Sequence, residues 1–213
     1  IGEKEKLLKD IEYVEPLSMN VKKTHHKRLL TVENLQLGYQ QLLFSPVNFT
    51  IDQNECVALT GGNGIGKSTI IHYLLDDFDG ITAGTIHKPN QLTISYVRQN
   101  YEDNRGTLSE FAEKQKVDYQ TFLNNLRKLG MEREVFHNRI EQMSMGQRKK
   151  VELAKSLSQE AELYIWDEPL NYLDVFNQVQ LEQLILSFKP ATLVVDHDQL
   201  FLNKIADRLI SLK

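Results

Sequence analysis

The chain has 213 residues and a formal net charge of −4 at pH 7, and 41% of its residues are hydrophobic. This length suits one large globular domain or two small ones with a packed core. The charge argues against a protein that coats nucleic acid with its whole surface, although it is compatible with a local basic patch. No apolar stretch approaches the roughly 20 residues of a membrane-spanning helix, and no signal peptide opens the chain. We therefore expect neither membrane insertion nor export.

A single cysteine, Cys56, lies inside an apolar run, where it is expected to be a small core residue. One cysteine excludes a disulfide framework, and a cytoplasmic location is expected. The first residue is Ile1 rather than Met, so the chain is expected to be a piece of a larger protein.

Residues 1–28 are rich in charge, contain one proline and lack an apolar period, as in a linker that leads into a domain. Their basic run, residues 22–28, has two interpretations: contact with RNA phosphates, or the more common solvated approach to a domain. From residue 29 to residue 51, short strand-like runs alternate with polar turns and predict an antiparallel β layer.

Three later runs are almost continuously apolar, with their polar residues at the C-terminal end: residues 55–60, 162–167 and 192–198. This pattern is typical of parallel strands that are buried on both faces. Ligands of such sheets bind just beyond the carboxyl ends of the strands.

Residues 99–157 have apolar spacings of three and four, with Gly130 at a helix end, and predict a helical insertion. Residues 175–188 and 199–206 are predicted to be further helices, and "RLISL" a closing strand.

A glycine-rich stretch, "GGNGIGKST", connects the first of these apolar runs to a helical pattern. A strand, G-x-x-x-x-G-K-[ST] and a helix form the P-loop pattern, whose fixed positions here are Gly61, Gly66, Lys67 and Ser68. Glycine lets main-chain N–H groups point at an anion, and the positive end of the helix adds to the attraction. The lysine ammonium is predicted to reach the terminal phosphates, and the serine hydroxyl to bind Mg²⁺.

The residues expected to bind the nucleotide are consecutive: Gly61, Gly62, Asn63, Gly64, Ile65, Gly66, Lys67, Ser68 and Thr69. The alternative is an ordinary glycine-rich turn with an exposed lysine. The position between a strand and a helix favours the phosphate-binding loop.

Two adjacent acids, Asp167 and Glu168, end the second apolar run. In a P-loop enzyme the first carboxylate holds Mg²⁺ and the second accepts a proton from the attacking water. By themselves they are more simply a solvated strand end, and the P-loop reverses that preference.

His197 ends the third apolar run, where an imidazole could bond the γ-phosphate, although a lone histidine is more often without function. Ser144 and Gly146 precede an amphipathic helix. A serine there is an ordinary N-cap, and the same geometry can bind a phosphate.

These motifs, in this order, resemble the nucleotide-binding domain of the ABC ATPase superfamily over residues 29–213. The resemblance implies an α/β P-loop NTPase fold with a mainly parallel core sheet, an antiparallel β subdomain and a helical subdomain at about residues 100–157. It also implies ATP and Mg²⁺ as the bound species.

The family assigns further residues by their position. Tyr39 stands where the family has an aromatic that stacks on adenine, although it could equally be a core tyrosine. Gln99 matches the glutamine that senses Mg²⁺ and the γ-phosphate, so it joins Ser68 and Asp167 as a metal-site residue. Glu168, His197 and Gln99 are the catalytic residues that the resemblance implies.

The family's signature, usually SGGQ, is "SMGQ" here, with Ser144, Gly146 and Gln147 matching and Met145 departing from the pattern. In the family this segment caps the nucleotide that the partner domain holds, so Met145 puts the activity of that site in doubt. Asp174 matches the loop that crosses between the two domains of a dimer.

Family members sandwich two ATP molecules between two domains, so the resemblance implies a second ABC domain for full activity, either an N-terminal half of the same protein or a second copy. "DEPLNYLD" is similar to the DEPTNHLD of ABC-F proteins, which bind the ribosome, more than to the SALD ending of transporters. The sequence around it, "WDEPLNYLDVF", resembles that of ABC-F members that confer antibiotic resistance by ribosome protection. The alternatives are a housekeeping translational ABC-F protein and the ATPase subunit of a membrane transporter.

Overall fold

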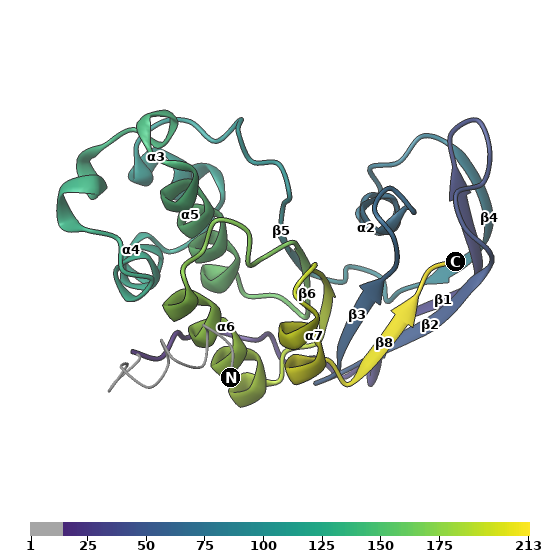
Figure 1. Ribbon diagram of the computed structural model, residues 1–213. Helices are drawn as coiled ribbons and strands as arrows, with labels where there is room; N and C mark the ends of the chain where they lie inside the picture. The colour runs from purple at the N-terminus through teal and green to yellow at the C-terminus, as the bar shows by residue number, and fades with distance from the viewer. Residues whose placement is uncertain (1–14) are drawn as a thin grey trace. The chain divides into compact units, whose positions relative to one another are not determined.

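The computed structural model describes residues 15–213, and these residues fold into two units (Figure 1). The sheet unit consists of residues 21–96, 161–169 and 189–213. The helical unit consists of the described residues before 21 together with residues 97–160 and 170–188.

A five-stranded sheet with the order β5-β6-β7-β3-β8 forms the centre of the sheet unit. The pairs β3–β7, β3–β8 and β6–β7 are parallel. Every residue of β6 and β7 is buried, which explains their almost continuous apolar sequence. The strands are β3 (Cys56–Thr60), β5 (Ile94–Val97), β6 (Leu163–Asp167), β7 (Thr192–Val195) and β8 (Arg208–Ser211).

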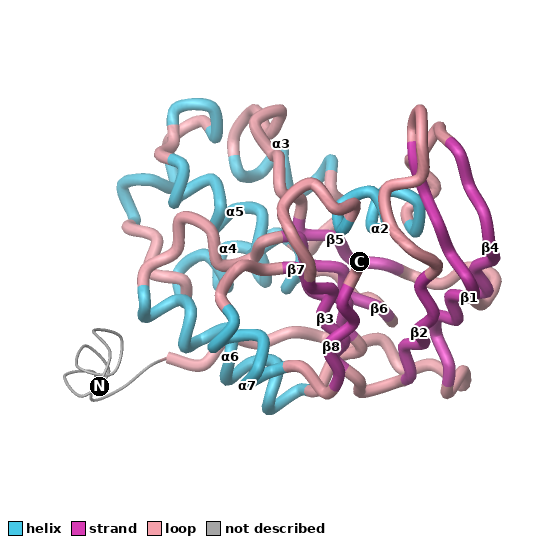
Figure 2. The backbone as a smooth tube through the Cα atoms, turned by 45° about the vertical axis from the view of Figure 1, so that its right-hand side comes forward, coloured by secondary structure: helices cyan, strands magenta, loops and turns pink. Residues whose placement is uncertain are grey.

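An antiparallel sheet with the order β2-β1-β4 accompanies it, as Figure 2 shows in magenta. Its strands are β1 (Arg28–Gly38), β2 (Val47–Asp52) and β4 (Ile81–His87). The predicted antiparallel layer is confirmed, because the strand-like runs between residues 29 and 51 form β1 and β2, which pair with each other. The sequence patterns did not predict β4, which is exposed along most of its length, or β5, which has only four residues.

One apolar cluster joins residues of both sheets to helix α2 (Lys67–Leu74). Ile70, Ile71 and Leu74 of α2 are buried in it, and so are Val57 and Leu59 of β3. The helix that carries the P-loop lysine is therefore held by the core of the sheet unit. Helix α7 (Gln199–Ile205) belongs to the same unit.

The helical unit contains four α-helices among its described residues: α3 (Leu108–Lys114), α4 (Tyr119–Lys128), α5 (Met145–Ser158) and α6 (Val175–Phe188). Two short 3-10 helices, η1 (Arg133–His137) and η2 (Ile140–Gln142), precede α5. Thr107 caps α3 with a capping box and Asp118 caps α4. Gly130 follows the end of α4 with φ of 75°, as predicted for a helix terminus.

The chain entering the domain is bound to the helical unit. Glu15 forms an ion pair with Arg127 of α4 at 2.9 Å, and its main-chain oxygen accepts a hydrogen bond from Gln180 of α6. Leu17 and Met19 are buried. The first half of the predicted linker, residues 1–14, lies outside the described residues.

No helix among residues 15–213 combines the length and apolar character required to cross a membrane. The α/β fold expected from the sequence, with parallel and antiparallel sheets and a group of helices, is confirmed.

Candidate nucleotide-binding site

The P-loop connects β3 to α2 and has an unusual main-chain conformation. Gly66 has φ of 112°, and a β-carbon there would lie 2.8 Å from the ring of Phe44, so only glycine fits without a shift. Gly64 has φ of 73° and nothing within 4 Å of a β-carbon position. The middle of the loop therefore presents open main chain to a ligand.

Lys67 begins α2 and bends back over this loop. Its ammonium donates to the main-chain oxygens of Gly61 at 2.9 Å and Gly62 at 2.8 Å, and the residue is only 8% exposed. An ammonium has three donors. The charge is therefore fixed beside the loop, with donor capacity remaining for an anion.

Three candidate side chains lie at the carboxyl ends of two adjacent parallel strands. Asp167 is the last residue of β6, Glu168 follows it directly, and His197 comes two positions after β7. Asp167 pairs with Val195 in the β6–β7 register, and Ala58 of β3 pairs with Val194. The acids, the histidine and the start of the P-loop are therefore at the same edge of one sheet.

Glu168 has φ of 51°, a left-handed conformation that is uncommon for a residue other than glycine. Its main-chain N–H donates to Val195 at 2.7 Å, and its Oε1 lies 3.0 Å from His197 Nε2. A carboxylate can only accept, so Nε2 carries the proton of this bond. Backbone strain of this kind is found at functional sites, where the surrounding structure holds a side chain in place.

The donor set fits a nucleoside triphosphate with Mg²⁺. The P-loop provides N–H groups and an ammonium for phosphates, while Ser68 and the buried Asp167 provide the oxygen ligands that Mg²⁺ prefers. Among residues 15–213, no group of three or more His, Cys, Asp or Glu side chains could hold a metal ion. A Mg²⁺ ion here would therefore take its remaining ligands from phosphate and water, as is usual for this ion.

Tyr39 follows β1 and is 60% exposed, so it is not a core tyrosine. Its ring lies at 5.3 Å from that of Phe78, at an interplanar angle of 62°. The sequence did not single out Phe78, because the contact joins two loops that are 39 positions apart.

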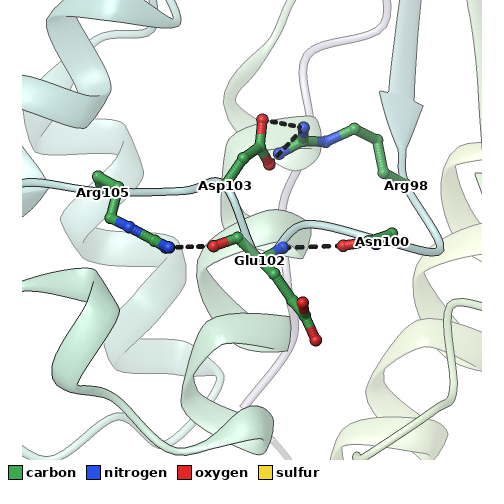
Figure 3. Close-up of a pocket in the computed structure, with 5 residues that line it drawn as sticks. All are labelled: Arg98, Asn100, Glu102, Asp103 and Arg105. Carbon is green, nitrogen blue, oxygen red and sulfur yellow. Dashed lines mark hydrogen bonds and ion pairs between the residues drawn. The ribbon is translucent and has the colours of Figure 1, made fainter.

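Gln99 belongs to the helical unit, in the loop that follows β5. Figure 3 shows Arg98 and Asn100, the residues on either side of it in the sequence. Polar side chains of this loop line a cavity of about 450 Å³, and Arg98 bonds both carboxylate oxygens of Asp103, at 2.9 and 3.1 Å. Glu102 N–H donates to Asn100 at 3.0 Å, and Arg105 donates to the main-chain oxygen of Glu102. The segment that carries Gln99 is thus ordered by its own polar contacts.

Glu152 of α5 fixes the same loop and was not anticipated, because it occupies an ordinary position in a helix. Its buried carboxylate accepts the main-chain N–H of Arg98 at 3.2 Å and the guanidinium Nε at 3.1 Å. Lys155 donates to it at 2.5 Å and Asn104 at 3.0 Å. Burial alone would raise the pKa of Glu152, but the charges of Lys155 and Arg98 outweigh burial and hold that pKa at about 2.

The signature residues begin α5. Ser144 is the N-cap, and it forms a capping box in which Gln147 N–H donates to the serine hydroxyl at 3.2 Å and the glutamine side chain accepts Ser144 N–H at 2.9 Å. A β-carbon at Gly146 would lie 3.1 Å from the main-chain oxygen of Tyr172, and Met145 is 37% exposed. Asp174 caps α6 by accepting Asn177 N–H at 2.8 Å.

The predicted site residues therefore fall into two groups. The sheet unit brings together the P-loop residues, Asp167, Glu168 and His197, and also contains Tyr39. The helical unit contains Gln99, the signature residues and Asp174.

A strand, a glycine-rich loop and a helix, with an acidic strand end at the same sheet edge, define a P-loop nucleoside triphosphate-binding domain. The model of the protein family described as "ABC transporter" matches residues 44–171. The chain belongs to this family, as an ATP-binding domain.

Individual comparisons agree. The chain is 32% identical over 197 residues to "Ribosome protection protein VmlR" of Bacillus subtilis (strain 168), which covers 91% of this chain and 36% of that protein. It is 26% identical over 195 residues to "ABC transporter F family member 2" of Arabidopsis thaliana, covering 88% of this chain and 28% of that protein. A solved structure, "Structure of ATP binding subunit of ABC transporter", is 25% identical with a TM-score of 0.71, covering 86% of this chain and 85% of the other.

The resemblance to ABC ATP-binding domains, and to the ABC-F class among them, is thus confirmed. The chain spans about a third of the length of these two curated relatives.

Proposed function

We propose that this domain binds MgATP and hydrolyses it together with a second ABC domain. The observation that carries the proposal is the shared sheet edge of the P-loop and the Glu168–His197 pair, 3.0 Å apart. A nucleotide whose phosphates lie on the P-loop would have its γ-phosphate near this pair.

Each side chain has a defined task in this mechanism. The P-loop N–H groups and Lys67 bind the β- and γ-phosphates, and Ser68 and Asp167 hold Mg²⁺, which neutralises the charge of the phosphates when it is bound. Glu168 accepts a proton from the attacking water, and the bond from His197 orients its carboxylate. Gln99 contributes to sensing the metal and the γ-phosphate.

The signature residues Ser144, Gly146 and Gln147, with Asp174, serve a nucleotide held by the second domain. Their support is positional: the capped start of α5 presents exposed residues, among them Met145 at 37% exposure. The second domain is the N-terminal half of a longer protein or, for the isolated chain, a second copy.

We assign the longer protein to the ABC-F class, with ribosome binding and protection from antibiotics as its task and the cytoplasm as its location. In this proposal residues 1–28 end the interdomain linker and residues 29–213 form the ABC domain. The 32% identity to a ribosome protection protein supports this assignment. Lys23, His25, His26 and Lys27 are exposed and are available for RNA phosphates.

The test is Glu168→Gln in the full-length protein. We expect MgATP binding to persist and turnover to fall by at least about a hundredfold, because the general base is lost. Near-normal turnover would contradict the assignment of the base.

Because the Glu168→Gln protein should keep ATP bound without hydrolysing it, this variant also tests whether the partner is the ribosome. With ATP present it is expected to sediment with ribosomes, and the Lys67→Ala variant, which should not trap ATP, serves as the control. Sedimentation with membranes instead of ribosomes would favour the transporter interpretation.

A further inference from the structure

Tyr39 needs a support if it is to bind a flat ring. It lies just beyond β1 and is 60% exposed, so it has little packing of its own. A tyrosine at a loop tip samples several rotamers, and ordering it on binding costs affinity. A neighbour that fixes the ring in advance reduces that cost.

Phe78 is this neighbour. Its ring makes edge-type contacts with Tyr39, at 5.3 Å and 62°, and with Tyr73, at 5.9 Å and 86°. Phe78 is partly buried, and it packs against the core of the sheet unit as Tyr73 does. Edge-type aromatic pairs prefer such geometry, so the contact restricts the orientation of the more exposed ring.

The turn that carries Phe78 is itself firmly held. After α2, the N–H groups of Asp76 and Asp77 donate to Tyr73 at 3.2 Å and to His72 at 2.9 Å. Lys88 of the neighbouring segment donates to the main-chain oxygen of Leu74 at 3.0 Å, next to the end of α2. These bonds satisfy the last carbonyls of the helix and fix the direction of the turn.

Gly80 allows the turn to approach β1. A β-carbon at Gly80 would lie 2.4 Å from the main-chain oxygen of Gly38 and 2.5 Å from the Phe78 ring. Gly38 pairs with Ile81 in the antiparallel sheet. Gly80 therefore lies close both to the Phe78 ring and to the residue that immediately precedes Tyr39.

We propose that Phe78 is a positioning residue for the nucleotide base and acts through Tyr39. Helix α2 begins at Lys67, the proposed phosphate-binding residue, and carries Tyr73 in its last turn. Together, α2, Phe78 and Tyr39 therefore set the distance between the phosphate site and the base site. The inference rests on the proposed function, because it requires a nucleotide on the P-loop. The base is a purine, whose two rings offer the larger stacking area.

The experiment compares two ligands, MgATP and magnesium tripolyphosphate, which lacks the base and the ribose. Phe78→Leu keeps apolar volume but removes the ring. We expect it to weaken MgATP binding by about threefold to tenfold, the effect of losing one aromatic pair, and to leave tripolyphosphate affinity unchanged. Phe78→Tyr retains the ring and is expected to restore wild-type affinity for MgATP.

Three further variants complete the design. Tyr39→Leu is expected to weaken MgATP binding, and adding Phe78→Leu to it should cause little further loss, because both changes remove one arrangement. Phe188→Leu, in the helical unit and 42% exposed, is the matched aromatic control and should not alter either affinity.

The inference would be overturned by equal loss of both ligands in Phe78→Leu, by unchanged MgATP affinity, or by additive effects in the double variant. A wild-type protein that binds neither ligand would overturn the proposed function, and this inference with it.

Discussion

Replacing Glu152 by Gln should destabilise the helical unit and remove a specific pH dependence. The carboxylate is fully buried and bonds Arg98, Asn104 and Lys155. Glutamine cannot accept hydrogen bonds at its amide nitrogen, so Lys155 loses its carboxylate partner and Arg98 keeps only that of Asp103. A buried ion pair that loses one partner typically costs about 3–5 kcal/mol.

The pKa gives an independent magnitude. The pKa of Glu152 is lowered from 4.5 to about 2 in the folded protein. At about 1.4 kcal/mol per pKa unit, this difference stabilises the folded state by about 3 kcal/mol near pH 7. Because the folded-state pKa is the lower one, the contribution is complete above the unfolded pKa and is lost as pH falls toward about 2.

Urea unfolding of the wild type and of Glu152→Gln, followed between pH 7 and pH 3, measures this contribution. We expect a difference of about 3 kcal/mol at pH 7 that falls to about 1 kcal/mol at pH 3. Glu102→Gln is the control, because it neutralises an exposed carboxylate of the loop after β5 that Glu152 holds; it should change stability little. A difference that stays constant with pH, or is absent at pH 7, would refute the assignment of Glu152 as a buried, charged anchor.

One further substitution tests the nucleotide site, and one labelling experiment tests the core. Lys67→Ala is expected to weaken MgATP binding by about tenfold to a hundredfold, because a charge-assisted bond to phosphate is lost. Isothermal titration calorimetry measures the affinity, with Lys114→Ala of α3 as the control. An unchanged affinity for MgATP would argue against the phosphate site. Cys56 should not react with a thiol reagent in the folded protein at pH 8, since burial raises the pKa of its thiol to about 12. Rapid labelling without denaturant would contradict its place in the core.

The sequence was most informative where local pattern and burial agree. The runs at residues 162–167 and 192–198 predicted buried parallel strands, and β6 and β7 are buried at every residue. The P-loop was predictable because its glycines are required by local main-chain geometry, as at Gly66. Its spacing along the chain directly reflects the conformation of one short segment.

Other features depend on contacts between distant segments. Strand β4 is exposed along most of its length and carries no strong alternation, so its strand state depends on pairing with β1. The left-handed conformation of Glu168 cannot be deduced from its residue type. The sequence predicted the residues of the candidate site, but not the neighbours that hold them, such as Phe78 and Glu152.

The attachment of Glu15 has a mechanical consequence. Its ion pair with Arg127 of α4 and its bond from Gln180 of α6 anchor the incoming chain to two helices of the same unit. Any rotation of these helices would therefore move Glu15 with them. A spectroscopic probe at the exposed Pro16, the neighbour of Glu15, would report on the movement of the helices.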